Sequence, residues 1–330
     1  MSAEHQPAYQ LRIGGLQLSS AAGSAVLSLR VQRDKYGGAG EAQITLGAGH
    51  GLDVALEDPV QLELGWGQNT EPVFTGRVAA IEPAYGFGAP RLLLTAFDPL
   101  MRLMRSPRKP RSFENQTPGD IVKAHARDAG VGIGTVQDGP RLAHALLHRQ
   151  SAYQQCRALA ERCGFDLYAG ADGKLQFARF ARRSADAVLQ HGIDLLELSR
   201  SRVAALAGVT VVPESPASSA GDETSTWLVK DPSAHAATAG DADTLTLSDP
   251  LLRTRAGAQL AAQSWLGSRW RGGTARALLP GRPSLQLGQA VELRGLPEAG
   301  LDGVYELLAL QHRLDVVRGF GTRLSLARLN

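Results

Sequence analysis

The chain has 330 residues, 43% of them hydrophobic and 20% charged, which is an ordinary composition for a folded protein and a length that suits two or three domains. It contains no run of 18 apolar residues, and its N-terminus lacks a basic start followed by an apolar segment. From these features we expect neither a membrane-spanning protein nor one exported with a signal peptide. The net charge of +3 is too small to indicate a dedicated nucleic-acid-binding protein.

The first 98 residues predict a β module. Apolar side chains alternate with polar ones around Leu11, from Val26 to Val31 and around Ile44, and glycine pairs lie between these runs. Alternation with a period of two is typical of strands buried on one face, and glycine pairs are typical of turns. We therefore expect residues 1–98 to form one β unit.

The pattern changes to helices in residues 99–180. Two helices are predicted, over residues 117–130 and 151–164. Each begins with Ser or Thr followed three residues later by Asp or Gln, and each ends at a glycine. A β-hairpin is predicted directly after the second helix, over residues 165–178. These elements predict a small α/β domain.

Residues 181–330 predict a second β module. Strands are expected over residues 187–198 and 203–212, and the last fifty residues have the alternation of an antiparallel meander. One long helix, over residues 251–271, is expected within this module. The predicted fold class is therefore mixed and mainly β, with two β modules flanking an α/β insert.

Part of the first module recurs in the second without a gap, 231 positions later. The matched positions are mostly apolar and are spaced as in strands, which predicts two copies of one β module. The alternative, that any two half-buried meanders share such a pattern, stays open. The matched pairs are Leu56 with Leu287, Val60 with Val291, Leu62 with Leu293, Val73 with Val304, Phe74 with Tyr305, and Leu93 with Leu324.

No metal or cofactor site is predicted. Cys156 and Cys163 lie about two helical turns apart, roughly 10 Å, which is too far for a disulfide, so we expect buried free thiols. His144 and His148 have the spacing of a zinc-binding pair on a helix. However, the glutamate of an HExxH motif is missing and no third ligand is close in the sequence.

No catalytic motif is present either. The sequence has no GxSxG, no phosphate-binding GxxxxGK[ST] and no CxxC. Several acidic residues could serve catalysis, but no pattern pairs them, and a glycosidase pair built from distant segments stays open. We expect these acids to be solvated or structural and the protein not to be an enzyme. They are Glu82, Asp98, Asp166 and Asp172.

The densest positive charge lies between residues 102 and 111, interleaved with apolar residues. Such a tract could bind phosphate backbones. We favour instead a domain junction whose basic side chains pair with acids of a neighbouring chain, because the interleaved apolar residues look buried. The sequence has 30 Arg and only 5 Lys, which suits permanent interfaces and equally a GC-rich genome. The basic residues are Arg102, Arg105, Arg108, Lys109 and Arg111.

The same tract carries a resemblance to a known family. The chain resembles the late control D proteins, which are tail hubs of contractile-tailed phages, and it is similar to the N-terminal half of VgrG spike proteins. The resemblance covers roughly residues 97–180 and 280–329, and the first ninety residues only by pattern. The elements that carry it are D-x-L-x-R-L (Asp98, Leu100, Arg102, Leu103), A-E-R-x-G-F (Ala160, Glu161, Arg162, Gly164, Phe165) and G-x-Y (Gly303, Tyr305).

The resemblance implies a structural protein. Members form a homotrimer in which two tube-protein-like barrels per chain build a ring of six, so that the ring adapts a six-fold tube to a three-fold spike. It implies as partners a spike protein, an inner tube or tube-initiator protein, baseplate wedge proteins and, as a further candidate, the tape measure. Assembly in the bacterial cytoplasm is implied too. The chain ends at Asn330 without the β-helix of VgrG, so the spike is expected to be a separate polypeptide.

Two stretches rich in small and polar residues, 213–225 and 231–241, are predicted to be flexible loops. Their acidic residues are candidates for pairing with arginines of the tube or of another hub chain. The acidic candidates are Asp222, Glu223, Asp241 and Asp243.

Two alternative functions stay open, a hub that also hydrolyses peptidoglycan and a basic module that binds cargo or nucleic acid.

Overall fold

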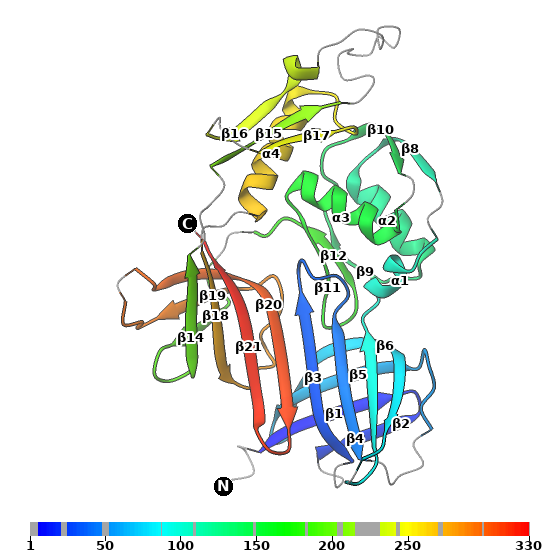
Figure 1. Cartoon of the computed structure of the whole chain (residues 1–330), viewed down its shortest axis with the longest axis vertical. Coiled ribbons are helices and arrows are strands. Elements are labelled where there is room, and N and C mark those ends of the chain that lie inside the picture. The colour runs from blue at the N-terminus through cyan, green and yellow to red at the C-terminus, as the bar shows by residue number, and fades with distance from the viewer. Residues whose placement is uncertain are drawn as a thin grey trace.

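The structure is a computed structural model of the whole chain. It describes residues 6–20, 25–47, 53–86, 88–107, 110–147, 150–181, 184–202, 207–214, 232–241, 245–269, 273–298 and 300–329. The fold is mainly β, as the sequence predicts, and Figure 1 shows large curved sheets at one end of the molecule and the helices toward the other. Within the described residues, no helix is long and apolar enough to cross a membrane.

The first β module is an antiparallel sheet wrapped around its own core. The alternating residues predicted to point inward are buried, among them Leu11, Ile44 and Leu62. The strand order is β3-β4-β7-β6-β5-β1-β2. Its strands are β1 (Pro7–Ile13), β2 (Leu16–Ser19), β3 (Val26–Asp34), β4 (Glu41–Gly47), β5 (Pro59–Trp66), β6 (Asn69–Ala84) and β7 (Arg91–Phe97).

The second β module has a similar order of strands. It runs β14-β18-β21-β20, and β19 pairs with β20 and, in parallel, with β13. A separate apolar core fills this module. Its strands are β13 (Ala187–Gln190), β14 (Glu197–Arg202), β18 (Gly273–Pro280), β19 (Ala290–Arg294), β20 (Gly303–Asp315) and β21 (Gly319–Arg328).

The two modules are joined edge to edge by backbone pairing, which the sequence did not predict. Strand β20 pairs with β3 in antiparallel orientation, from Ala309 opposite Asp34 to Asp315 opposite Ser28. The joined strands form one continuous sheet, visible across the lower half of Figure 1. At the base of the joint, the indole of Trp66 donates to the carbonyl of Gly281 at 2.8 Å. The modules are therefore held in one fixed arrangement.

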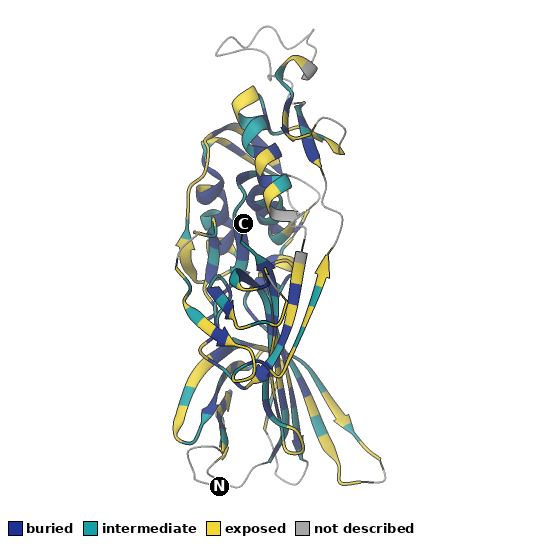
Figure 2. Cartoon of the chain, turned by 90° about the vertical axis from the view of Figure 1, so that its left-hand side faces the viewer, coloured by how far each residue is buried: buried dark blue, intermediate teal, exposed yellow. Residues whose placement is uncertain are grey.

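The α/β insert has the predicted helices and hairpin. Both long helices begin with the capping boxes seen in the sequence, and Gly164, with φ of 64°, ends the second one in the left-handed region that favours glycine. Figure 2 shows that these helices are largely buried. The elements are α1 (Leu100–Met104), β8 (Arg111–Gln116), α2 (Pro118–Asp128), β9 (Ile133–Val136), β10 (Leu142–Leu147), α3 (Ala152–Cys163), β11 (Asp166–Ala169) and β12 (Leu175–Ala178).

A fourth unit was not predicted as such. The expected long helix is present as α4 (Arg255–Arg269), but it packs on a separate three-stranded sheet with its own core rather than on the second β module. Of the predicted flexible loop 231–241, the described part is a 3-10 helix and a strand, so that prediction is wrong. The remaining elements are β15 (Gly208–Pro213), η4 (Pro232–His235), β16 (Ala237–Gly240) and β17 (Leu245–Asp249).

Small residues explain that error. Strand β16 reads ATAG, and Ala237 and Ala239 are buried beneath α4 without any large apolar side chain. Alanine allows a helix to approach a sheet closely, so a strand can be ordered without the apolar periodicity on which the prediction depended. The other predicted loop, 213–225, lies outside the described residues apart from Pro213 and Glu214, where β15 ends.

The repeated module is present, but the gapless alignment is wrong within it. Val60 lies opposite Gly76 in the first module, whereas its match Val291 lies opposite Tyr305 in the second. Tyr305 therefore corresponds to Gly76 and not to Phe74, and Phe74 corresponds to a glycine, Gly303. Each module has one buried aromatic ring and one glycine on the same face of the strand, in opposite order. Phe74 and Tyr305 are buried, at 1% and 2% exposure, but at different positions.

Candidate functional site

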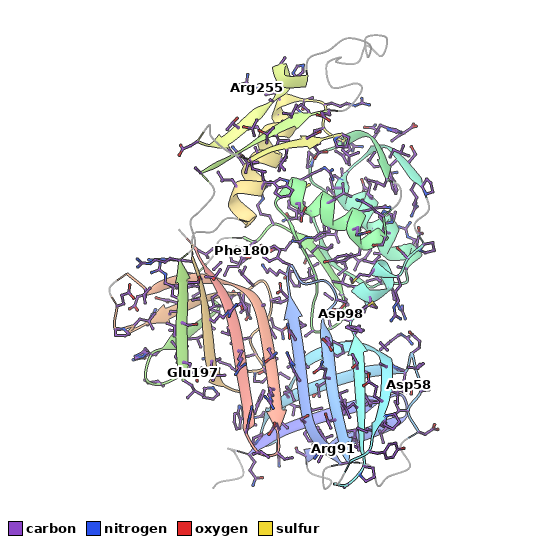
Figure 3. All side chains as sticks on the ribbon, viewed as in Figure 1. Asp58, Arg91, Asp98, Phe180, Glu197 and Arg255 are labelled. Carbon is purple, nitrogen blue, oxygen red and sulfur yellow. The ribbon has the colours of Figure 1, made fainter. Side chains whose placement is uncertain are left out.

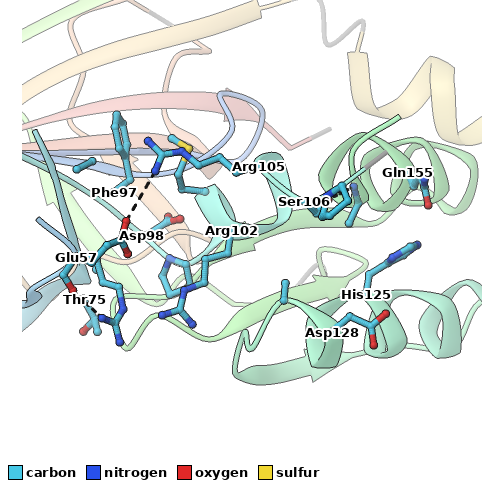
Figure 4. Close-up of a pocket in the computed structure, with 18 of the residues that line it drawn as sticks. Glu57, Thr75, Phe97, Asp98, Arg102, Arg105, Ser106, His125, Asp128 and Gln155 are labelled. Atoms are coloured by element: carbon cyan, nitrogen blue, oxygen red, sulfur yellow. Dashed lines mark hydrogen bonds and ion pairs between the residues drawn. The ribbon is translucent and has the colours of Figure 1, made fainter. Parts of the chain in front are cut away.

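A groove of about 880 Å³ lies between the first β module and the insert. One wall comes from β6 and from Glu57, the opposite wall from the segment 97–107, and α2 and α3 close the inner end with His125 and Gln155 (Figure 4). Four arginines and three carboxylates line it among apolar side chains, so the cleft contains charges of both signs. They are Arg77, Arg102, Arg105, Arg111, Glu57, Asp98 and Asp128.

The basic tract singled out in the sequence forms one side of this groove. Buried Leu100 and Leu103 anchor the short helix α1 in the core of the insert, as the prediction of buried apolar residues required, and Phe113 is buried too. Met104 departs from that prediction, because it is 39% exposed. Arg108 and Lys109 lie outside the described residues.

The described arginines of the tract have partners within the chain. Arg105 lies 3.9 Å from the carboxylate of Glu57, and Arg111 forms an ion pair with Asp128. These pairs are solvent-exposed, so each contributes little to stability. Arg102 donates to the carbonyl of Gly130 at 2.9 Å.

Two guanidinium groups of the groove form no ion pair with a carboxylate of the described residues. In the described part of the chain, Arg77 donates to the backbone carbonyl of Glu57 at 2.6 Å, and Arg102 donates only to a backbone carbonyl as well. His125 adds no positive charge at neutral pH, because burial and the neighbouring Arg111 lower its pKa to about 4. The groove can therefore accept anionic groups of another chain through its arginines.

Asp98 fixes the crossing from the first β module into the insert, at the position labelled in Figure 3. Its buried carboxylate accepts hydrogen bonds from the backbone N–H of Gly40 at 2.7 Å and of Leu100 at 2.9 Å. Burial raises its pKa to about 7, against these hydrogen bonds and the charge of Arg33. A side chain at Gly40 would meet this carboxylate at 2.7 Å, so the contact requires glycine there.

A buried ion-pair network joins three parts of the fold. The ammonium of Lys35, just after β3, lies 2.6 Å from Asp166 of β11 and 2.6 Å from Glu306 of β20. The Lys35 side chain is fully buried. One lysine therefore connects the first β module, the insert and the second β module.

The surroundings of Lys35 favour its charged form. The rings of Tyr168 and Phe180 lie 5.6 and 4.9 Å from its ammonium. Burial opposes the charge, but the two carboxylates outweigh that effect and raise the pKa of Lys35. Arg33, two residues before Lys35, is buried as well, and the charge that acts most strongly on its guanidinium is the carboxylate of Asp98.

The structure gives the other sequence candidates structural roles. His144 lies on strand β10 and not on a helix, and it contacts the hydroxyl of Ser112 at 3.0 Å, while His148 is outside the described residues. Cys156 and Cys163 are buried free thiols, as predicted, and burial raises the pKa of each to about 12. No cluster of potential metal ligands occurs among the described residues.

The acidic loop candidates are mostly beyond what the structure describes. Asp222, Glu223 and Asp243 lie outside the described residues. Asp241 is exposed directly after β16, in the unit built around α4, whereas the arginine groove lies between the first β module and the insert. Pairing of these acids with arginines of another chain remains a prediction.

Sequence reasoning missed the ion-pair network because its members are 131 and 271 residues apart. Asp166 was noted only as an unpaired acid, and Glu306 was not noted. The one available signal was Lys35 itself, which follows the alternating strand β3 and is one of only five lysines in an arginine-rich chain.

Solved structures of tail proteins share this fold over almost the whole chain. The tail protein of Neisseria meningitidis MC58 matches with a TM-score of 0.76 and 17% identity, covering 98% of this chain and 97% of that one. The 43 kDa tail protein of prophage MuSo2 from Shewanella oneidensis matches at 0.75 and 16%, covering 98% of both chains. An Escherichia coli type VI secretion component, described as structurally similar to T4 bacteriophage tail proteins, matches at 0.62 and 12%, covering 97% and 77%. No protein-family model matches the sequence, and no curated protein matches it significantly.

Proposed function

We propose that this protein is the central hub of a contractile injection particle, a homotrimer that joins a six-fold inner tube to a three-fold spike. The observation that carries the proposal is the repeated β module. Two copies per chain and three chains give six equivalent units, the number that a six-fold tube requires. The full-length match in fold to tail proteins supports the same function.

The bracing of the modules suits a mechanical role. Lys35 and its two carboxylates, together with the pairing of β3 and β20, fix the angle between the two repeats. A ring that transmits force must hold its units at constant angles, and a buried ion pair favours one arrangement over others because any other leaves charges unpaired. We propose domain limits at residues 98 and 180, with residues 208–269 as a separate unit inserted in the second module.

The arginine groove is the proposed contact for a neighbouring protein. Its guanidinium groups that form no ion pair within the described residues suit acidic side chains of the tube, of a wedge protein or of another hub chain. We propose no catalytic role for it, and the particle would be assembled in the bacterial cytoplasm from this chain, a separate spike, the tube and the wedge.

Co-expression with a tube protein and a spike protein from the same genome tests the proposal. We expect a complex with three hub chains, three spike chains and six tube subunits, counted by native mass spectrometry. A complex with a different hub number would contradict the adaptor. A clear band on a cell-wall zymogram would favour a peptidoglycan hydrolase instead, and a salt-dependent gel shift lost in Arg102→Gln would favour nucleic-acid binding.

A further inference from the structure

The large sheet contains the same four-strand block twice. The order β3-β4-β7-β6 in the first module corresponds to β14-β18-β21-β20 in the second. Each block has a bulge in its last strand, one residue after Val78 in β6 and one residue after Leu307 in β20. The aligned row across the first block is Leu29, Ile44, Leu94, Ile81, and across the second it is Leu198, Ala277, Leu324, Leu310.

The two blocks meet in one specific way. The C-terminal half of β20, beyond its pairing with β19, exposes an edge that β3 covers, with Leu314 opposite Leu29. The joint is thus the last strand of the second block against the first strand of the first block. Leu29 and Leu314 are both buried there, at 0% and 7% exposure.

Each outer side of the sheet presents one of the two edges that form this joint, without a partner strand among the described residues. The corresponding edge of β6 begins beyond Val78, and no described strand pairs with it. The first strand of the second block, β14, pairs only with β18 among the described strands. Figures 1 and 3 show these edges on opposite sides of the sheet, β14 with Glu197 on the left and β6 on the right.

We infer that β14 of one copy pairs in antiparallel orientation with the C-terminal half of β6 of a second copy, repeating the joint between β3 and β20. The internal joint sets the register. Leu314 follows Leu310 by four residues, as Tyr85 follows Ile81, and Leu198 corresponds to Leu29. Leu198 is therefore opposite Tyr85, and Arg202 is opposite Ile81.

The exposed side chains at the two edges fit this occupant. Tyr85 is 81% exposed and Leu196, two residues before Leu198, is 62% exposed, although both are large and apolar. Pairing would cover both, as the internal joint covers Leu29 and Leu314. In the internal joint, the backbone N–H of Lys35 donates to the carbonyl of Leu308, so every second pair from there, including Arg33/Leu310 and Leu29/Leu314, is hydrogen-bonded. Pro83 has the position in β6 that corresponds to such a pair, so its nitrogen points to the outer edge. The new joint therefore has one hydrogen bond fewer than the internal one.

A joint between two different edges is a head-to-tail contact. Such contacts close into a ring when the rotation from one copy to the next divides a full turn. Pairing between two copies of β6 or two copies of β14 would instead give closed dimers. The inference rests on the proposed function only for closure at three copies, because the edges and the register come from the chain itself.

Engineered disulfides test the register. Ser199 is opposite Ala84 in a pair without mutual hydrogen bonds, where Cα atoms are about 4.5 Å apart and a disulfide fits. We expect the full chain with Ser199→Cys and Ala84→Cys to form a covalent trimer under oxidation, with a dimer as its intermediate on a non-reducing gel. An equal mixture of the two single variants should give only covalent dimers, and each single variant alone should stay monomeric on the gel. The native cysteines are buried and do not compete.

The matched control moves one cysteine by two residues, to Glu82→Cys with Ser199→Cys, and should cross-link at least ten times more slowly. Equal cross-linking in both double variants, or none in the first, would overturn the pairing. Native mass spectrometry of the reduced protein separates the two failures. A trimer that does not cross-link overturns only this joint, whereas a monomer contradicts both the joint and the proposed hub.

Discussion

Lys35 is the residue on which three parts of the fold depend. Replacing it by Met leaves the carboxylates of Asp166 and Glu306 buried without a counter-charge, and breaking a buried ion pair in this way costs about 3 to 5 kcal/mol. We expect that loss in the free energy of unfolding measured with urea. The triple variant with Asp166→Asn and Glu306→Gln should recover most of it. A loss below about 1 kcal/mol in Lys35→Met would show that the network does not brace the modules.

His312 gives the fold a dependence on acid pH. It is fully buried, contacts the hydroxyl of Thr322 at 2.9 Å through Nδ1, and burial lowers its pKa to about 3, with Arg33 adding to the effect. A lowered pKa means that stability is complete above pH 6.5 and is lost as the pH falls toward 3. In His312→Asn, which keeps a polar group at the Nδ1 position, the stability deficit against wild type should shrink as the pH falls from 6.5 to 4, by at most about 1.4 kcal/mol per pH unit. A deficit that does not change with pH would contradict this.

The two buried aromatic rings fill the cores of the two modules from non-equivalent positions. Replacing Phe74 or Tyr305 by Ala should cost about 3 to 5 kcal/mol each, measured by denaturant unfolding. Tyr305→Phe is the matched control. It removes only the hydrogen bond from the hydroxyl to the carbonyl of Leu301 at 2.7 Å and should cost about 1 kcal/mol. If Tyr305→Ala were no worse than Tyr305→Phe, the ring would not support the core.

At the scale of elements, the arginine segment after α1 should matter for assembly and not for folding. Charge reversal at Arg105, Arg108 and Arg111 replaces attraction by repulsion at the proposed contact. We expect particles to be absent in electron micrographs while the melting temperature changes by only a few degrees, since the pairs lost within the chain are exposed. Arg127→Glu, on the exposed side of α2 and outside the groove, is the control and should assemble. Normal particles from the triple variant would exclude the groove as an interface.

Elements defined by local chemistry could be predicted from the sequence. The two capped helices, α2 and α3, and the hairpin that follows them have their signals within a few residues, and the structure confirms them. The first β module is visible because alternation survives in each strand. Strand β16 was missed because alanine packs against α4 without an apolar signal.

Features that depend on distant segments could not be predicted. The pairing of β3 with β20 joins residues about 280 positions apart, and no sequence pattern in β3 distinguishes that neighbour from solvent. The repeat could be detected from the sequence. Its alignment was wrong at Phe74, because one module has an aromatic residue where the other has a glycine, and this exchange leaves the alternation of apolar residues unchanged. For the site, the basic tract was found because it is local, whereas Lys35 and its carboxylates converge only in the fold.

At the scale of the whole molecule, we expect the working unit to contain more than one copy of the chain. The outer edges of β14 and of the C-terminal half of β6 pair with no described strand, and unpaired edges promote association. We expect a permanent interface that buries more than roughly 2,000 Å² per pair of chains. A structure of the assembly with a markedly smaller interface would indicate a transient contact rather than a permanent ring.

The number of chains in the free or spike-bound hub tests the central claim most directly. Mass photometry of the full chain at micromolar concentration, with the spike protein present, should show hub complexes that contain three chains of 35.0 kDa, or about 105 kDa of hub. Three chains supply the six β modules that a six-fold tube needs. A single species at 35.0 kDa under these conditions, with no trimer, would contradict the account.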